Sequence, residues 1–128
     1  MKLEFTIAGD AALRTMLQGM ESGVVPQVAR SLVNSLEQVL TVSKDVYVPI
    51  DTGFLKSSGY VSLTSGGSAE VVVEIGYRAD YAIYVHEINK AYKGGRQWKY
   101  LETPLKAALP HIKDKLSDDL IRWIEATK

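Results

Sequence analysis

The sequence predicts an α+β domain in which a small, mostly antiparallel sheet packs against a long helix from the N-terminal half and a helix at the C-terminus. Apolar residues recur every three or four positions over residues 24–46 and again after residue 103, and they alternate in segments between. Pro49 stands where the period changes, and a proline there cannot continue a helix. The 128 residues have the length of one ordinary domain, which we expect to span residues 1–128.

Composition limits the classes of function. Fifteen basic and fifteen acidic residues give a formal net charge of zero, which predicts no general attraction to nucleic acid or to a membrane. The absence of cysteine excludes disulfides, thiolate metal sites and cysteine nucleophiles. The sequence shows no signal-peptide pattern and no long uncharged apolar run, so we expect a soluble protein without a membrane partner.

The first third of the chain predicts one strand followed by helix. Residues 2–7 alternate between apolar and polar side chains, as a half-buried strand does. Asp10 is a plausible N-cap for a short helix that ends before residue 19. A longer helix is expected over residues 24–46, with Pro26 in the first turn, where its missing N–H costs nothing. Glycines between the two leave open whether they are separate helices or one bent helix.

The middle of the chain predicts a turn and a hairpin. Asp51-Thr52-Gly53 combines a carboxylate that can bond to its own backbone with a glycine free to adopt positive φ. Residues 55–63 and 69–77 read as two strands, and the composition of residues 64–68 is that of a hairpin loop.

The last third predicts two helices. Residues 81–87 fit either a two-turn helix or a short strand. Thr103 and Pro104 are expected to be the N-cap and the first residue of the final helix, which carries one apolar stripe. Pro110 should kink or split this helix, because it removes one hydrogen bond and its ring clashes with the preceding turn.

The candidate catalytic groups form no recognisable constellation. His86 and Glu87 are adjacent, and neighbours on a short helix point about 100° apart, so we expect them not to share a site. His111 is expected on the solvated side of the last helix or beside its kink. The sequence contains no phosphate-binding loop, nucleophile elbow or His-Glu-x-x-His pair. We therefore expect no enzymatic activity, no cofactor, no metal and no small-molecule substrate, with a nuclease or hydrolase as a residual alternative. Other carboxylates and a lysine considered for such a site are Asp51, Glu70, Glu74, Asp80 and Lys90.

Residues 89–100, which we call the basic-aromatic loop, concentrate cations and aromatic rings without an acid. The Gly94-Gly95 pair suggests a mobile segment. Such a loop can contact DNA phosphates or an acidic partner surface, with ring stacking as a supplement. The alternative is a solvated loop whose Trp98 and Tyr100 pack into the core, and for Trp98 we favour that alternative. The predicted contact residues are Lys90, Tyr92, Lys93, Arg96 and Lys99.

Three segments resemble the sequence signatures of small head-tail joining or tail-completion proteins of long-tailed bacteriophages, a family often described as minor capsid proteins or tail components. They are Pro49-Ile50-Asp51-Thr52-Gly53-Phe54-Leu55-Lys56-Ser57-Ser58, then Gly76 with Tyr81-Ala82-Ile83-Tyr84-Val85-His86-Glu87, and finally Trp98 with Pro104-Leu105-Lys106-Ala107-Ala108-Leu109. The resemblance favours a helix over residues 81–87. It departs at Ile88-Asn89-Lys90, where a glycine and a threonine often follow the glutamate. The signature residues, for which the resemblance implies a structural role, are Pro49, Asp51, Thr52, Gly53, Leu55, Ser58, Tyr81, Ala82, Tyr84, Glu87 and Pro104.

The resemblance implies a virion assembly protein that joins or completes the head-tail junction, or neck, of a phage or prophage. It implies a homo-oligomeric ring that contacts portal or head-completion proteins and tail-tube proteins around the DNA channel. The protein would be in the host cytoplasm during assembly and then in the virion. In this interpretation, alanine at Lys90, Lys93 and Arg96 together should leave folding intact and impair joining. A small DNA-binding module that uses residues 89–100 is the alternative from a different functional class.

Overall fold

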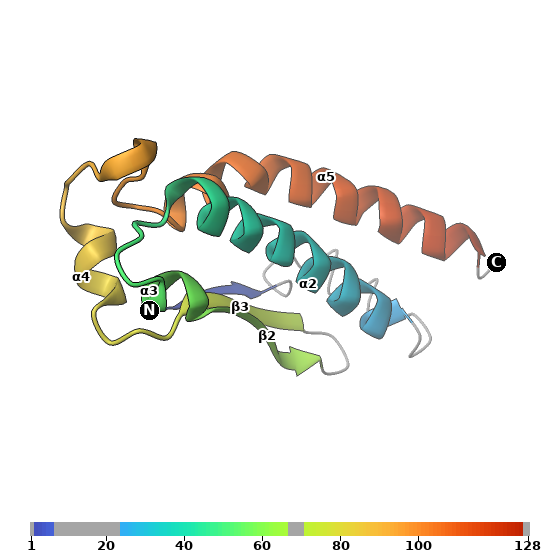
Figure 1. The fold of residues 1–128 in the computed structure, drawn as a ribbon. Coiled ribbons are helices and arrows are strands. Elements are labelled where there is room, and N and C mark those ends of the chain that lie inside the picture. The colour runs from blue at the N-terminus through green and yellow to red at the C-terminus, as the bar shows by residue number, and fades with distance from the viewer. Residues whose placement is uncertain (1, 7–23, 67–70, 127–128) are drawn as a thin grey trace.

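The computed structural model describes residues 2–6, 24–66 and 71–126 (Figure 1). It has the predicted α+β architecture of a small antiparallel sheet with a long helix and a C-terminal helix. The expected helix after Asp10 lies outside the described residues. The elements in chain order are β1 (Lys2–Thr6), α2 (Val24–Val42), the π-helical turn η1 (Ser43–Tyr47), α3 (Phe54–Ser57), β2 (Gly59–Gly66), β3 (Val71–Tyr77), α4 (Ala82–Glu87), the 3₁₀ turn η2 (Lys93–Gly95) and α5 (Glu102–Ala126).

The sheet has the order β1-β3-β2, and both neighbouring pairs are antiparallel. The central strand β3 therefore receives a partner on each edge: Ile75 stands opposite Leu3 of β1 and opposite Val61 of β2. Val73 and Ile75 are fully buried, and Val72 on the other face is half-buried.

The two long helices lie on the same side of the sheet, with α2 between the sheet and α5 (Figure 1). The three-and-four spacing of α2 places Leu32 and Leu36 in the core, where neither is exposed to solvent. Helices α3 and α4 and the turn η2 lie together at one end of the molecule, and the C-terminal end of α5 lies at the other (Figure 1). Most of the candidate residues are thereby collected at a single end.

The strand predicted from residue 55 begins at Gly59 instead, because residues 54–57 form a helical turn. Gly53 precedes that turn with φ of 85° and leaves the side-chain oxygen of Thr52 near the N–H of Phe54, 3.3 Å away. The hydroxyl of Ser57 then donates to the carbonyl of Phe54. Serine side chains that bond to nearby backbone offer the chain an alternative to strand pairing.

Strand β2 also extends further toward the C-terminus than predicted. It continues to Gly66, through three residues that were expected in the hairpin loop, and its register shifts between Leu63 and Ser65. Residues 67–70, the remainder of that loop and the start of the next predicted strand, lie outside the described residues. The first described residue of β3 is Val71.

Helix α2 passes into η1, which ends at Tyr47, one residue beyond the predicted end. The π-helical turn directs Ser43 into the core, where it is fully buried. Its Oγ lies 2.6 Å from the carbonyl oxygen of Tyr100 and 2.7 Å from the hydroxyl of Tyr77. Because serine has one hydroxyl hydrogen and gives it to the carbonyl, Tyr77 must donate to Ser43. Burial raises the pKa of Tyr77 to about 12, so its hydroxyl stays protonated at neutral pH.

Helix α5 begins at Glu102, so Thr103 is not its N-cap as predicted but lies inside the first turn. The N–H of Thr103 donates to the carbonyl of Lys99, 3.0 Å away. Pro104 is the third residue of the helix and not the first as predicted, but it is still in the first turn, where no backbone donor is required. The helix continues through Pro110, so the alternative of a split helix is wrong.

We predict that Gly59→Ala lowers the free energy of unfolding by about 1 to 3 kcal/mol, as overpacking does. A Cβ atom at this position would lie 2.7 Å from Cε of Lys44, 3.0 Å from Cδ1 of Leu40 and 3.1 Å from Cε1 of Tyr77. The lysine can move, whereas Leu40 and Tyr77 are buried. Denaturant unfolding measures the effect. Ser62→Ala on the same strand, expected within about 0.5 kcal/mol of wild type, is the control; equal stability of both variants would contradict the prediction.

Candidate interaction surface

The structure brings the first two signature segments together. The turn at residues 49–53 lies beside α4, and Tyr92 of the basic-aromatic loop joins them. Together they enclose a hollow of about 260 Å³. We call this hollow the end pocket, and its lining residues are Pro49, Ile50, Asp51, Thr52, Gly53, Leu55, Tyr81, Val85 and Tyr92.

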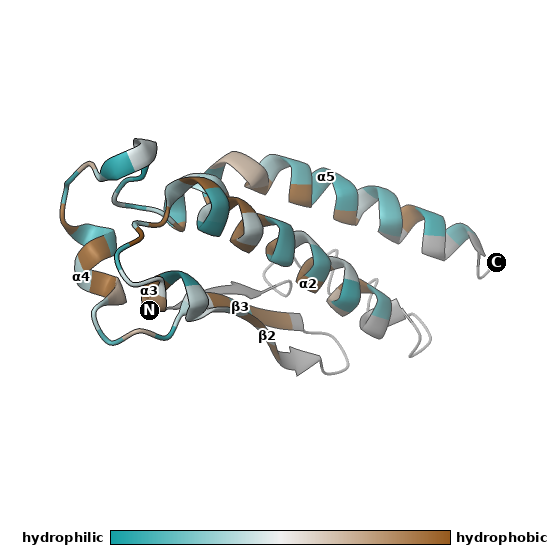
Figure 2. Ribbon diagram, in the orientation of Figure 1, coloured by the Kyte–Doolittle hydropathy of each residue, from teal (hydrophilic) through white to brown (hydrophobic). Residues whose placement is uncertain are grey.

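Large apolar side chains are exposed around the end pocket. Six of the ten large exposed hydrophobic residues in the described part of the chain come from residues 50–54 and 81–88. The rings of Phe54 and Tyr81 stand 6.2 Å apart and connect the two segments. Figure 2 shows that α4 is among the most hydrophobic elements although it lies at the surface. We call this surface the apolar end; it consists of Ile50, Phe54, Tyr81, Ile83, Tyr84 and Ile88.

An exposed, aromatic-rich apolar surface is typical of a site that another macromolecule covers. Tyr84 is 67% exposed and Phe54 is 57% exposed, so neither contributes much to the core of the isolated chain. Their placement has no evident benefit for folding. The arrangement can bind a partner.

The signature residues divide between packing and surface. Leu55, Ala82 and Pro104 are buried, and the positive φ of Gly53 makes the turn. The hydroxyl of Ser58 donates to the carbonyl of Leu55, 2.8 Å away. The half-buried or exposed members are Pro49, Asp51, Thr52, Tyr81, Tyr84 and Glu87.

The basic-aromatic loop, for which the composition suggests a mobile segment, forms a compact hairpin in the structure. Ala91 pairs with Gln97 in an isolated antiparallel bridge, and the N–H of Tyr92 donates to the carbonyl of Arg96, 2.8 Å away. Gly94 and Gly95 adopt φ of 72° and 76° at its tip, which glycine accommodates without strain. The N–H of Gln97 donates to the carbonyl of Tyr47, 2.9 Å away, and this bond ties the hairpin to the end of η1.

Arg96 holds this hairpin against the end of α2. Its Nη1 donates to the carbonyls of Lys44 and Val48, at 3.0 and 2.8 Å, and its Nη2 donates to the carbonyl of Asp45, at 3.0 Å. These carbonyls belong to or directly follow η1, where helix ends leave acceptors without intrahelical partners. The structure thus gives Arg96 a capping role, and we predict that its replacement destabilises the fold, in contrast to the expectation from the sequence.

Lys99 is also committed to contacts within the chain. Its Nζ lies 2.5 Å from Glu87 and 3.1 Å from Glu102, and Lys106 approaches Glu102 at 2.8 Å. Hydrogen bonds from these lysines lower the pKa of Glu102 to about 2, and Lys99 also lowers the pKa of Glu87. The same hydrogen bonds raise the pKa of Lys99.

Two of the predicted contact cations remain directed to solvent. Lys93 is exposed at the hairpin tip, and exposed Lys90 lies 5.2 Å from the centre of the Tyr92 ring. A DNA-binding module that uses this loop would therefore have fewer available charges than the sequence indicated, because Arg96 and Lys99 are already paired.

His86 is buried, with 3% of its surface exposed, and it joins α4 to α5. Its Nε2 accepts the N–H of Glu102 at 3.2 Å, and its Nδ1 lies 3.0 Å from Glu87. Since Nε2 accepts, Nδ1 carries the proton and donates to the carboxylate. The prediction that His86 and Glu87 share no site is wrong. Glu87 is the last residue of α4, and its carboxylate contacts both Nδ1 of His86 and Nζ of Lys99.

Burial is the main cause of a lowered pKa for His86, and it outweighs the neighbouring carboxylates, which act in the opposite direction. The ring of Tyr100 contacts His86 edge-on at 5.0 Å, and its hydroxyl donates to the carbonyl of Ala82. Tyr100 is fully buried, whereas Trp98, for which core packing was favoured, is only half-buried beside Lys99. The contacts of His86 and Tyr100 thus form a structural junction beneath the apolar end.

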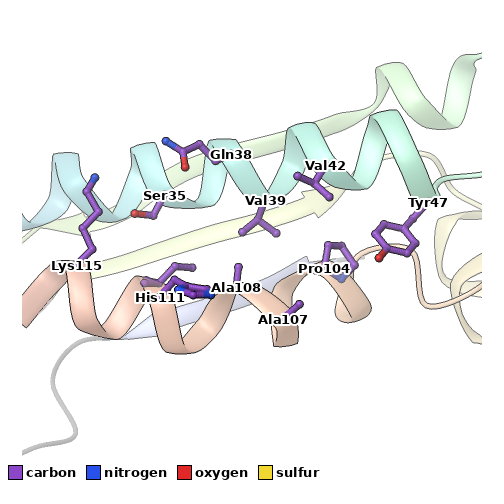
Figure 3. Close-up of a pocket in the computed structure, with 11 residues that line it drawn as sticks. Ser35, Gln38, Val39, Val42, Tyr47, Pro104, Ala107, Ala108, His111 and Lys115 are labelled. Carbon is purple, nitrogen blue, oxygen red and sulfur yellow. The ribbon is translucent and has the colours of Figure 1, made fainter.

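A second hollow, of about 390 Å³, lies between α2 and α5 (Figure 3). Figure 3 shows Val39 and Val42 on α2 facing Ala108 on α5, with Tyr47 near one end and Lys115 near the other. His111 is exposed and lines this groove from α5, one residue after Pro110. No acidic side chain lines this groove, and nowhere in the described ranges do three histidine or carboxylate residues gather as metal ligands.

The fold and this surface define a small α+β protein with one apolar, aromatic end and a polar junction buried behind it. Comparison of the chain with protein-family models, with curated proteins and with solved structures yields no match. Among the described helices, none has both the length and the apolar character that a bilayer crossing requires.

Proposed function

We propose that this protein is a structural subunit of the neck of a long-tailed phage or prophage, where it joins or completes the head-tail junction as one member of a ring. The observation that carries the proposal is the apolar end: two segments that resemble the family's signatures, more than twenty residues apart in sequence, meet there.

The surface suits a role in assembly. A ring subunit must present surfaces that are covered by its neighbours or by the components above and below it. Exposed tyrosine, phenylalanine and isoleucine side chains gain most from such burial, and tyrosine also satisfies its hydroxyl at a partly wet interface. The partners would be further copies of the chain together with portal or head-completion and tail-tube proteins, in the host cytoplasm during assembly and then in the virion.

Electron microscopy of particles from a phage or prophage with this one gene disrupted tests the proposal. Filled heads and separate tails would support a joining role. Abnormally long tails would support completion of the tail within the same structural class. Intact virions in normal numbers would overturn the proposal, and Lys90→Ala with Lys93→Ala would then be tested for loss of salt-sensitive DNA binding.

We predict that Phe54→Ser with Tyr84→Ser leaves the fold unchanged and impairs assembly. Both side chains are largely exposed, so stability should remain within about 0.5 kcal/mol per site. Truncation of an aromatic residue that is a hot spot of an interface costs about 2 kcal/mol or more of binding free energy, and each 1.4 kcal/mol corresponds to about tenfold in the association constant. The readouts are thermal unfolding and the infectious titre of a disrupted phage that is supplied with the variant.

Ile121→Ser is the matched control for this variant. Ile121 is 54% exposed and lies on α5 toward the C-terminal end, opposite the apolar end (Figure 1). It should restore the wild-type titre. If the double variant also restores that titre, the apolar end is not an assembly surface.

A further inference from the structure

We propose that the end pocket receives a cationic side chain, arginine or lysine, from a partner protein. The inference deepens the proposed function and rests on it for the identity of the partner, whereas the pocket's preference for a cation rests on the geometry of the pocket itself. Three features of the pocket support this preference: its size, its apolar walls and one carboxylate that has no partner among the described residues.

The size of the end pocket suits one long side chain. Its volume of about 260 Å³ lies below the range of about 300 to 1,000 Å³ that is usual for pockets that hold drug-sized ligands. Pro49, Val85 and Leu55 provide apolar walls, along which the methylene groups of an arginine or lysine can lie. The pocket opens within the apolar end, so a side chain that entered it would belong to a molecule covering that surface.

Asp51 supplies the charge. Its side chain is exposed, it lines the end pocket, and it makes no hydrogen bond or ion pair with any residue in the described ranges. The carboxylates of Glu87 and Glu102, by contrast, are both paired with Lys99. A carboxylate that is unpaired among the described residues, on a residue that lines a mostly apolar pocket, favours a partner that carries the opposite charge.

The two tyrosines strengthen this preference. Tyr81 and Tyr92 line the pocket, and the face of a tyrosine ring attracts a cation. Nζ of Lys90 already lies 5.2 Å from the centre of the Tyr92 ring, so an incoming cation would share or displace that contact at Tyr92. A neutral apolar side chain would remove water from Asp51 without replacing its interactions, and an acidic side chain would be repelled. A cation satisfies both the carboxylate and the rings.

Nuclear magnetic resonance titration of the ¹⁵N-labelled protein with N-acetyl-arginine amide tests the proposal. We expect saturable shifts at the amides of residues 50–55 and 81–85 and of Tyr92. N-acetyl-norleucine amide, which has a similar unbranched stem without the charge, should produce weaker shifts. Asp51→Asn retains the shape of the turn residue and should weaken arginine binding roughly tenfold, as expected for loss of a charge-assisted hydrogen bond. Asp114→Asn on α5, which removes an exposed carboxylate away from the pocket, should bind as wild type does.

Three results would overturn the proposal: no saturable shift with the arginine probe, equal binding of the norleucine probe, or equal binding by Asp51→Asn with its spectrum otherwise unchanged. The pocket and the proposed function can fail separately. If the protein binds arginine specifically but virions form normally without its gene, the proposal for the pocket stands and the proposed role in the neck is wrong. If the disrupted phage yields separate heads and tails but the protein does not bind arginine, the proposed role in the neck stands and the proposal for the pocket is wrong.

Discussion

Arg96→Ala should lower the free energy of unfolding by about 2 to 4 kcal/mol. The substitution removes three hydrogen bonds from one guanidinium to backbone carbonyls. Hydrogen bonds to a charged group contribute about 1.5 to 3 kcal/mol each when taken singly, but these three share one side chain and are partly open to water, so they do not add fully. Denaturant unfolding followed by circular dichroism measures the change.

Two variants show whether the effect belongs to the guanidinium. Lys93→Ala removes an exposed cation from the same hairpin and should stay within about 0.5 kcal/mol of wild type. Arg96→Lys retains the charge but not the planar fork that reaches several carbonyls at once, so it should recover only part of the loss. Equal stability of Arg96→Ala and Lys93→Ala would show that the capping contacts contribute nothing measurable.

This role changes the design of the assembly experiment. A variant with alanine at Lys90, Lys93 and Arg96 would confuse a folding defect with a defect in partner binding. The variant that tests the solvent-directed cations is Lys90→Ala with Lys93→Ala, because no described hydrogen bond or ion pair is lost when those two charges are removed.

The stability of the protein should fall as the pH is lowered below about 6.5, the ordinary pKa of histidine. The folded state holds the pKa of His86 below that value, so the unfolded chain binds the proton more readily. The stabilisation is complete above pH 6.5 and is lost as the pH falls toward the folded pKa. Protonation would also place a donor where Nε2 accepts the N–H of Glu102, which opposes the start of α5. Denaturant unfolding at a series of pH values measures the loss.

His86→Gln should reduce the pH dependence in this window, since the amide oxygen of glutamine can accept the same N–H and does not titrate. His111→Gln, at an exposed position on α5, is the matched control for the loss of a histidine side chain. Glu87 and Glu102 have lowered pKa values, so their contribution is present above about pH 4.5 and is lost only in stronger acid. An unchanged slope between pH 5 and 6.5 in His86→Gln would contradict the assignment.

The sequence alone determined the main elements of the fold through local constraints. Leu32 and Leu36 belong to a three-and-four spacing of apolar residues that predicts a helix with one buried face, and α2 is that helix. The alternation over residues 71–77 predicts a strand, and β3 is present there. Pro49 ends the first helical region, and the short helix expected over residues 81–87 is present as α4. Local patterns failed at residues 54–58, because the hydroxyls of Ser57 and Ser58 bond to the backbone of the same turn.

The tertiary structure decided which candidate residues belong together and which are available. Arg96 and Asp45 are 51 positions apart in the sequence. The composition of residues 89–100 presents Arg96 as a free cation and does not predict that its guanidinium contacts the carbonyls at the end of α2. Tyr92 joins Asp51 in one pocket for the same reason: pairing across long sequence separations depends on how α2, α4 and the hairpin pack. Spacing specifies the local backbone conformation of each segment, whereas the partner of each polar group is set by the packing of segments distant in sequence.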